Sequence, residues 1–175
     1  METCHRPSLR RKKPSRMGFT LVEAICATLI VAMGAVAIMV SAASGTRVNS
    51  ASEKLTQATF LAQEVREWTL SLPFTDPDDA DEGNPPGPDG SDPQSFVDDL
   101  DDLMDVVYSP PRDGRGMAIS DMNSWSQQID IEWRDPSDLT TAVAAGTSEI
   151  VYLEVTVLYD GVQVMQTGWL VAERN

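Results

Sequence analysis

The sequence predicts an α+β protein in which one long N-terminal helix, membrane-spanning in its first half, packs on a small antiparallel β-sheet. Three observations predict this class. An apolar run follows a basic N-terminus, an amphipathic pattern continues from that run, and the last third of the chain alternates apolar and polar residues around a turn signal. The length of 175 residues suits one domain with an appendage.

Charge divides the chain into two zones. The chain has 13 Lys and Arg against 27 Asp and Glu, and residues 1–18 hold six of the bases and one of the acids. Residues 19–175 therefore carry a net charge of −19. Such a chain would repel nucleic-acid phosphates, so we predict no contact with nucleic acid.

The segment 19–43 is apolar throughout except for one glutamate, and reads FTLVEAICATLIVAMGAVAIMVSAA. Its 25 residues would form roughly 37 Å of helix, enough to cross a hydrocarbon core of about 30 Å. The basic residues before it predict a cytoplasmic N-terminus and an exported remainder. The alternative is a secretory signal cleaved after Ser41-Ala42-Ala43, although the run is longer than the usual apolar region of about 7–15 residues.

Glu23 is the single charged side chain in this segment. A carboxylate at that depth costs on the order of 3 kcal/mol, so it must be neutralised or paired. The alternative is a glutamate near the membrane edge that reaches water.

The residues Arg16-Met17-Gly18-Phe19-Thr20-Leu21-Val22-Glu23 resemble the type III signal of type IV pilins and of the pseudopilins of type II secretion. That signal is a short basic leader, then Gly and Phe, with Glu at the fifth mature position before an apolar helix. The resemblance extends with less detail to about residue 72 and beyond that is architectural. Many type IVa pilins carry a proline midway along this helix, whereas residues 19–45 have none and carry Gly34 and Gly45.

The resemblance implies roles for three residues. Prepilin peptidase would cut the Gly18–Phe19 bond, Phe19 would become an N-methylated amino terminus, and Glu23 would pair with the amine of Phe19 in its own or a neighbouring subunit. A buried carboxylate is tolerable only with such a partner. The implied partners are other pilin or pseudopilin subunits, the peptidase and an inner-membrane assembly platform.

An amphipathic pattern predicts that the helix continues to about residue 72, and Pro73 ends it. The apolar positions recur at three- and four-residue steps: Val48, Ala51, Leu55, Ala58, Leu61, Val65, Trp68 and Leu72. This stripe should lie against the sheet.

Residues 76–105 hold twelve acids and no Lys or Arg. Prolines and glycines keep 76–93 irregular, while 95–107 could form a short helix or turn. Calcium is one hypothesis, and the family analogy supports it slightly. However, Asp79-Ala80-Asp81-Glu82-Gly83 places glycine one position too early for DxDxDG, so we assign no metal ligands and favour a solvated acidic loop.

The last third predicts three antiparallel strands, at 124–133, 150–159 and 162–171, with 134–148 as a connecting loop. Asp160-Gly161 predicts a two-residue hairpin turn. The expected cross-strand pairs are Tyr159 with Val162, Val157 with Val164, Val155 with Gln166, Tyr152 with Trp169, and Val151 with Leu170. The second part of the long helix is the expected cover for the apolar face.

The predicted regions are a removed leader (1–18), a membrane or filament-core helix (19–45), an amphipathic helix (46–73), an acidic Pro/Gly-rich region (74–115) and the sheet of a periplasmic domain (116–175). His5 is the single histidine, and Cys4 and Cys26 are the cysteines, so no nucleophile–imidazole pair or His/Cys zinc site remains once the leader is removed. A carboxylate hydrolase has only abundant acids in its favour, and we predict a protein that is not an enzyme.

The predicted function is therefore a structural subunit, a minor pilin or pseudopilin. It would first lie in the inner membrane as a single-pass protein and then in a periplasmic or cell-surface filament. The charge of −19 favours an accessory or tip subunit, since closely stacked copies would repel. The alternative is a membrane-tethered or secreted binding module that never polymerises and whose acidic loop binds cations.

Overall fold

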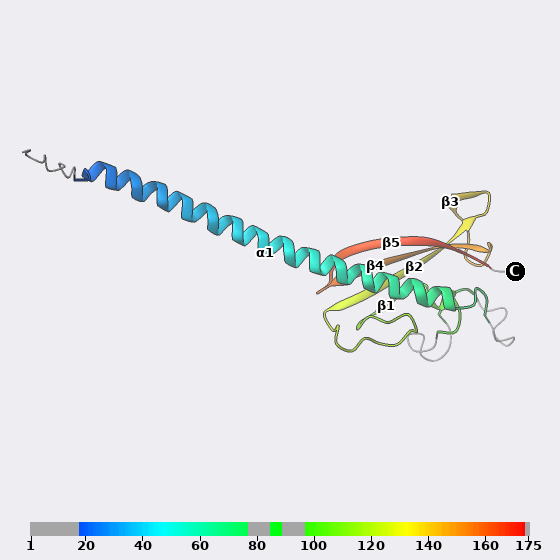
Figure 1. Ribbon diagram of the computed structural model, residues 1–175. Helices are drawn as coiled ribbons and strands as arrows, with labels where there is room; N and C mark the ends of the chain where they lie inside the picture. The colour runs from blue at the N-terminus through cyan, green and yellow to red at the C-terminus, as the bar shows by residue number, and fades with distance from the viewer. Residues whose placement is uncertain (1–17, 77–84, 89–96, 174–175) are drawn as a thin grey trace, which may run out of the picture. The chain divides into compact units, whose positions relative to one another are not determined.

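The computed structural model describes residues 18–76, 85–88 and 97–173. The chain divides into two compact units, Met1–Arg47 (unit 1) and Val48–Asn175 (unit 2). One helix, α1 (Leu21–Ser71), begins in unit 1 and ends in unit 2 (Figure 1). The elements that follow are η1 (Asp101–Leu103), β1 (Val106–Tyr108), β2 (Trp125–Asp135), β3 (Asp138–Ala142), β4 (Ile150–Tyr159) and β5 (Val162–Ala172).

Local sequence sets both ends of α1. The Thr20 hydroxyl accepts a hydrogen bond from the Glu23 backbone N–H at 3.2 Å, and the Thr20 carbonyl accepts one from Ala24 N–H at 3.1 Å. A threonine three residues before a glutamate is the start of a capping box. The helix ends at Ser71, two residues before Pro73, as predicted.

The two parts of α1 differ in burial. Every described residue up to Glu53 is exposed, whereas six residues farther along are buried: Ala58, Leu61, Ala62, Val65, Trp68 and Thr69. The predicted apolar stripe is therefore confirmed from Ala58 onward. Its earlier members Val48 and Leu55 are exposed, because the sheet covers the helix only from about residue 58.

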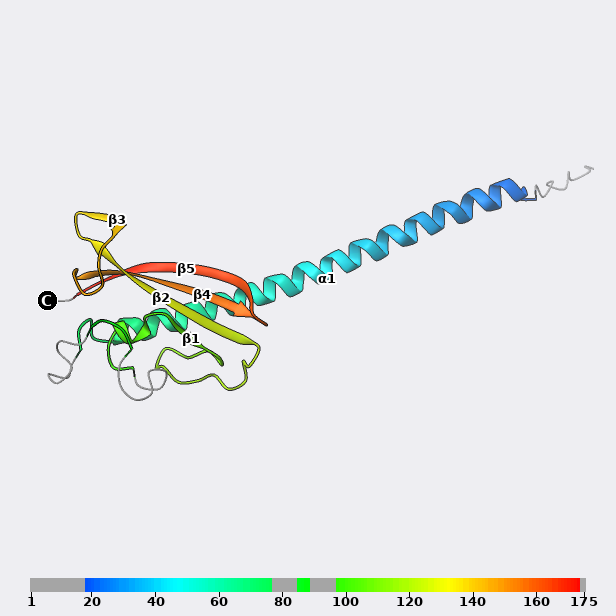
Figure 2. The same ribbon diagram turned by 180° about the vertical axis from the view of Figure 1, so that it is seen from behind.

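The sheet has the strand order β1-β2-β4-β5, with β3 paired to β2, and all pairs are antiparallel. In unit 2, α1 lies across one face of this sheet (Figures 1 and 2). On β2 and β4 every second residue is buried beneath the helix. The predicted strands and the α+β class are confirmed.

The predicted register of the hairpin holds for its first two pairs, Tyr159 with Val162 and Leu158 with Gln163, and is wrong beyond them. Val157 pairs with Met165 instead of Val164, so Val164 is an extra residue on β5. Such a bulge shifts all later pairs by one residue and exchanges the two faces of the strand.

Because the faces of β5 exchange, the remaining pairs also differ from the predicted ones. Val155 pairs with Thr167, Tyr152 with Leu170 and Val151 with Val171. Trp169 lies opposite Leu153 and packs against the core, while Gln166 lies exposed on the outer face. Thr167, and not Gln166, is therefore the residue opposite Val155 on the apolar face.

Two strands were not predicted. β1 lies within the region assigned to the acidic loop, so the sheet begins at Val106 rather than near residue 116, and β3 lies within the predicted 134–148 loop. β1 has three residues, Val106–Tyr108, all of them apolar, and β3 is exposed at all five residues. Neither therefore shows the alternation of apolar and polar residues that predicts a strand. Within 97–107, the predicted helix or turn is the three-residue η1 followed by β1.

Candidate functional site

The predicted signal residues lie at the start of α1. Gly18 and Phe19 precede the helix, and the Phe19 side chain is 80% exposed. Glu23 lies in the first turn of the helix, and no ion pair to it is found among residues 18–76, 85–88 and 97–173. In the uncut chain the nitrogen of Phe19 is a peptide nitrogen, so the charge that Glu23 is expected to meet does not exist. The leader, residues 1–17, lies outside the described residues.

One helix in the described part of the chain, α1, is long and apolar enough to cross a membrane. None of the residues in its apolar stretch is buried inside the protein. Apolar side chains exposed over a continuous helix require lipid or protein around them.

An acidic turn, Asp98–Asp102, brings three carboxylates together. One oxygen from each of Asp99, Asp101 and Asp102 lies within 4.8 Å of the others. Asp99 and Asp102 are almost fully buried. Asp99 Oδ1 accepts hydrogen bonds from the backbone N–H groups of Asp101 (3.0 Å) and Asp102 (3.2 Å), and Asp102 Oδ2 accepts one from Asp98 N–H at 3.0 Å.

The electrostatics of the acidic turn are unfavourable for three full charges. Burial, and secondarily the charge of Asp101, raises the pKa of Asp99 to about 7. Burial also raises the pKa of Asp101. A hard cation could be held by such carboxylates, because calcium prefers several oxygen ligands. This group is not the predicted stretch Asp79–Gly83, which lies outside the described residues.

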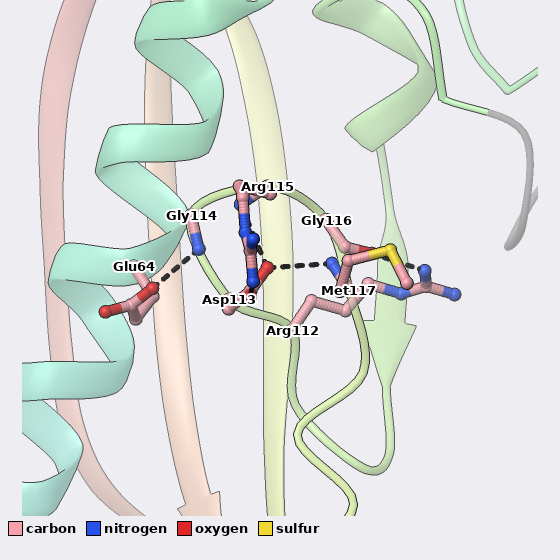
Figure 3. Close-up of polar contacts among 7 residues, drawn as sticks. All are labelled: Glu64, Arg112, Asp113, Gly114, Arg115, Gly116 and Met117. Carbon is pink, nitrogen blue, oxygen red and sulfur yellow. Dashed lines mark hydrogen bonds and ion pairs between the residues drawn. The ribbon is translucent and has the colours of Figure 1, made fainter.

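A second turn, Arg112–Met117, is fastened to α1 and β2 by two side chains, and we call it the clasped loop. Gln127 on β2 is fully buried; its Oε1 accepts from Arg112 N–H at 2.7 Å, and its Nε2 donates to the carbonyls of Arg112 (3.1 Å) and Leu61 (2.9 Å). The Glu64 carboxylate on α1 accepts from Gly114 N–H at 2.6 Å (Figure 3). The loop is therefore held by β2 at its first residue, Arg112, and by α1 at Gly114 near its middle.

The clasped loop is also bonded internally. The Asp113 carboxylate accepts from the N–H groups of Arg115 (3.0 Å) and Met117 (2.9 Å), and the Arg112 guanidinium donates to Gly116 O at 2.6 Å. The Met117 N–H, the Arg115 guanidinium and the Arg115 N–H, which all donate to this carboxylate, lower the pKa of Asp113. Gly116 has φ +73° and a Cβ there would lie 2.7 Å from the Trp68 ring, so only glycine fits.

The sequence pattern did not identify the clasped loop as a unit. Gln127 is the polar residue among the inward-facing positions of β2, and this is the one local signal. The residues it bonds, Arg112 and Leu61, lie in a loop and a helix distant in sequence, so no local pattern identifies them.

A cavity of about 290 Å³ lies where α1 ends beside β5. It is lined mainly by apolar residues, among them Leu70, Phe74 and Val171, with Glu173 as its one carboxylate. Its other polar side chains are the hydroxyls of Thr69 and Thr75, and the lining holds no histidine, lysine or second carboxylate beside them.

No protein-family model, curated protein or solved structure matches this chain.

Proposed function

We propose that this chain is a subunit of a type IV pilus or of a type II secretion pseudopilus, in the position of a minor subunit. The observation that carries the proposal is the order of parts along α1. A Gly18–Phe19 bond stands directly before the helix, Glu23 lies in its first turn, an exposed apolar stretch follows, and the last part of the helix packs on its own sheet.

The chemistry proposed for the N-terminus starts with hydrolysis of the Gly18–Phe19 bond by prepilin peptidase. The cut gives Phe19 a free amine, which is then N-methylated and remains cationic. Glu23 would meet this cation four residues away, or in a neighbouring subunit, within a low-dielectric surrounding where an unpaired carboxylate is costly. Pairing between subunits would also fix their register.

Before assembly, the proposed location is the inner membrane, crossed once, with the basic leader in the cytoplasm and unit 2 in the periplasm. Other pilin or pseudopilin subunits and an inner-membrane assembly platform are the proposed partners. After assembly the same helix would lie in the filament core.

The test of processing is mass spectrometry of the full chain expressed in cells that contain prepilin peptidase. The expected mature protein begins at methylated Phe19. A terminus at Ser44 would instead identify a secretory signal and overturn the filament proposal.

The test of the Glu23 role is incorporation of variants into filaments. We expect Glu23→Ala and Glu23→Gln to be cut normally but incorporated at least tenfold less, whereas Glu23→Asp retains part of the activity. Glu53→Ala is the matched control, because Glu53 lies on the same helix outside the apolar stretch and is exposed. Equal incorporation of Glu23→Ala and the control contradicts the proposal.

The second candidate is a tethered or secreted module that binds cations through acidic residues and does not polymerise. The buried carboxylates of the acidic turn are the observation that favours it. Calorimetric titration of the full chain with calcium tests this candidate, and absence of heat at millimolar calcium would end it. Asp101→Asn should weaken any binding measured, since it removes one of the three carboxylates.

A further inference from the structure

β5 forms one edge of the sheet in unit 2. It is the last strand in the order β1-β2-β4-β5, and among the described residues it pairs with β4 alone (Figure 1). After the bulge at Val164, its pairing with β4 is regular from Met165 to Ala172. We call this regular stretch, residues 165–172, the open edge.

Alternate residues of the open edge direct their backbone N–H and C=O groups away from β4. The Glu173 N–H donates to the Glu149 carbonyl at 2.9 Å, which places the odd-numbered residues of β5 beyond the bulge in the hydrogen-bonded pairs with β4. The even-numbered residues face outward, and in the described part of the chain their backbone groups have no protein partner: Gln166, Gly168, Leu170 and Ala172.

The open edge lacks most of the features that protect exposed strands. β5 contains no charged residue and no proline, although the chain holds 27 Asp and Glu. Its bulge at Val164 lies near the hairpin turn and leaves the open edge regular. A long uncharged strand with outward-facing backbone groups is a template for a further strand, because only an extended chain matches its alternating donors and acceptors.

Apolar side chains are exposed on both faces of the sheet at this edge. On the face away from α1, Leu170 is 46% exposed. On the helix-covered face, Val171 lines the cavity described above together with Leu70 at the end of α1, which is 48% exposed. An added strand with apolar residues would therefore bury surface on either face.

Charge indicates what kind of strand fits. Asp130 on β2 and Glu154 on β4 lie opposite each other on the face away from α1, and neither forms an ion pair with a described residue. Like charges in a cross-strand pair destabilise a sheet, so a cation supplied from outside is favourable there. A strand added to β5 would lie about 10 Å from β4, a distance that a lysine or arginine side chain and Glu154 span together. A second copy of β5 offers no such residue.

We infer that the open edge binds an extended strand of a different protein, with apolar residues and at least one lysine or arginine, and that this strand extends the sheet of unit 2. The four outward-facing residues hold its backbone by hydrogen bonds, and its basic residue lies near Glu154. The inference concerns unit 2 alone and does not depend on cleavage at Gly18–Phe19. It agrees with a minor subunit, which has unlike neighbours.

The first experiment identifies the occupant. The photo-crosslinking residue benzoylphenylalanine replaces Leu170 in the full chain, in the cells that naturally produce it, and crosslinked peptides are mapped by mass spectrometry. We expect crosslinks to one short segment of a protein other than this chain. The matched control is position 139, because Leu139 is also a partly exposed apolar residue but lies on β3; it should not yield that segment. Crosslinks to a second copy alone, to lipid alone, to many unrelated segments or to nothing overturn the inference.

The second experiment tests whether the segment binds as a strand. A synthetic peptide of the crosslinked segment is added to the full chain in detergent, and hydrogen exchange of the amides of β5 is measured residue by residue. Strand addition slows exchange at Gln166, Gly168, Leu170 and Ala172, whereas the odd-numbered residues already donate to β4 and change little. Uniform slowing, or none, overturns the inference, because a bound helix or a contact through side chains does not follow this alternation.

Substitution at one position separates backbone from side-chain binding. Leu170→Pro removes an outward-facing N–H and leaves the hydrogen bonds to β4, and we expect it to weaken binding of the peptide by about tenfold. Leu170→Ala keeps that N–H and should weaken binding less. Ala172→Pro is a second variant of the same kind, for use if Leu170→Pro does not fold.

Tryptophan fluorescence during denaturation checks the folding of each variant, because all four tryptophans lie in unit 2. Equal binding of the peptide by a folded proline variant and by Leu170→Ala contradicts the inference.

Discussion

The acidic turn and the clasped loop are neighbouring polar turns of unit 2 that are held in opposite ways. In the acidic turn, the carboxylates of Asp99 and Asp102 accept hydrogen bonds from backbone N–H groups of the turn itself. Both residues are buried, so their like charges lie close together away from water. In the clasped loop, the carboxylates of Glu64 and Asp113 accept from N–H groups, and the Gln127 amide both accepts from and donates to Arg112. Hydrogen bonds alone therefore do not make a turn stabilising. The charges that they bring together decide whether the turn raises or lowers the free energy of unfolding.

The largest expected effect comes from removing the amide that fastens the clasped loop. Gln127→Met keeps the volume but removes the buried amide and with it the hydrogen bonds to Arg112 N–H, Arg112 O and Leu61 O. We expect the free energy of unfolding of the full chain in detergent to fall by about 3 kcal/mol, the cost of buried unsatisfied groups. Gln128→Met, on the half-exposed face of the same strand, should change it by less than about 0.5 kcal/mol. Equal effects would show that the clasp contributes nothing.

The next effect tests the contact of the clasped loop with the helix. Gly116→Ala combines an unfavourable positive φ with a clash against Trp68, and we expect a loss of about 2 kcal/mol. Gly161→Ala separates the two causes, since Gly161 also has positive φ but has open space around it. Its loss should be about 1 kcal/mol. Denaturation followed by tryptophan fluorescence measures both, and a larger loss for Gly161→Ala would contradict the packing argument.

Removing a charge from the acidic turn should raise the free energy of unfolding, whereas the substitutions in the clasped loop lower it. Because the pKa of Asp99 is raised to about 7, the folded state holds a proton that the unfolded state has released above about pH 4. Its contribution to stability is therefore full at low pH and is lost as the pH rises toward 7. Asp99→Asn keeps an oxygen acceptor without the charge, and we expect a gain of about 1 kcal/mol at pH 8, less than the full shift because the turn can relax and admit water.

The control for this pH effect is Asp121→Asn, an exposed aspartate outside the turn. Denaturation midpoints measured from pH 4 to pH 8 should converge for Asp99→Asn and the parent protein at the acidic end. A constant difference across that range would mean that ionisation of Asp99 is not the cause.

The smallest effect concerns the surface ion pair of the clasped loop. The Arg115 guanidinium lies 3.0 Å from Asp113, but its side chain is 83% exposed. We expect Arg115→Ala to change the free energy of unfolding by less than about 0.5 kcal/mol, and any change to vanish in high salt. A larger, salt-independent loss would show that the arginine holds the loop by packing.

Much of the fold could be predicted from the sequence because its signals are local. The helical period and Pro73 determined α1 to within two residues at each end, and alternation with Asp160-Gly161 determined β2, β4 and β5. The candidate signal at Gly18, Phe19 and Glu23 is likewise a matter of spacing, and its pairing with a free amine stays a prediction.

Tertiary structure decided what local patterns do not encode. One extra residue at Val164 exchanged the faces of β5 and brought Trp169 to the core, and nothing in the alternating pattern marks that bulge. Short strands such as β1 become strands only because β2 offers an edge to pair with. The amide of Gln127 acquires its role from α1 and the clasped loop, because burial and hydrogen-bond partners depend on contacts between residues far apart in the chain.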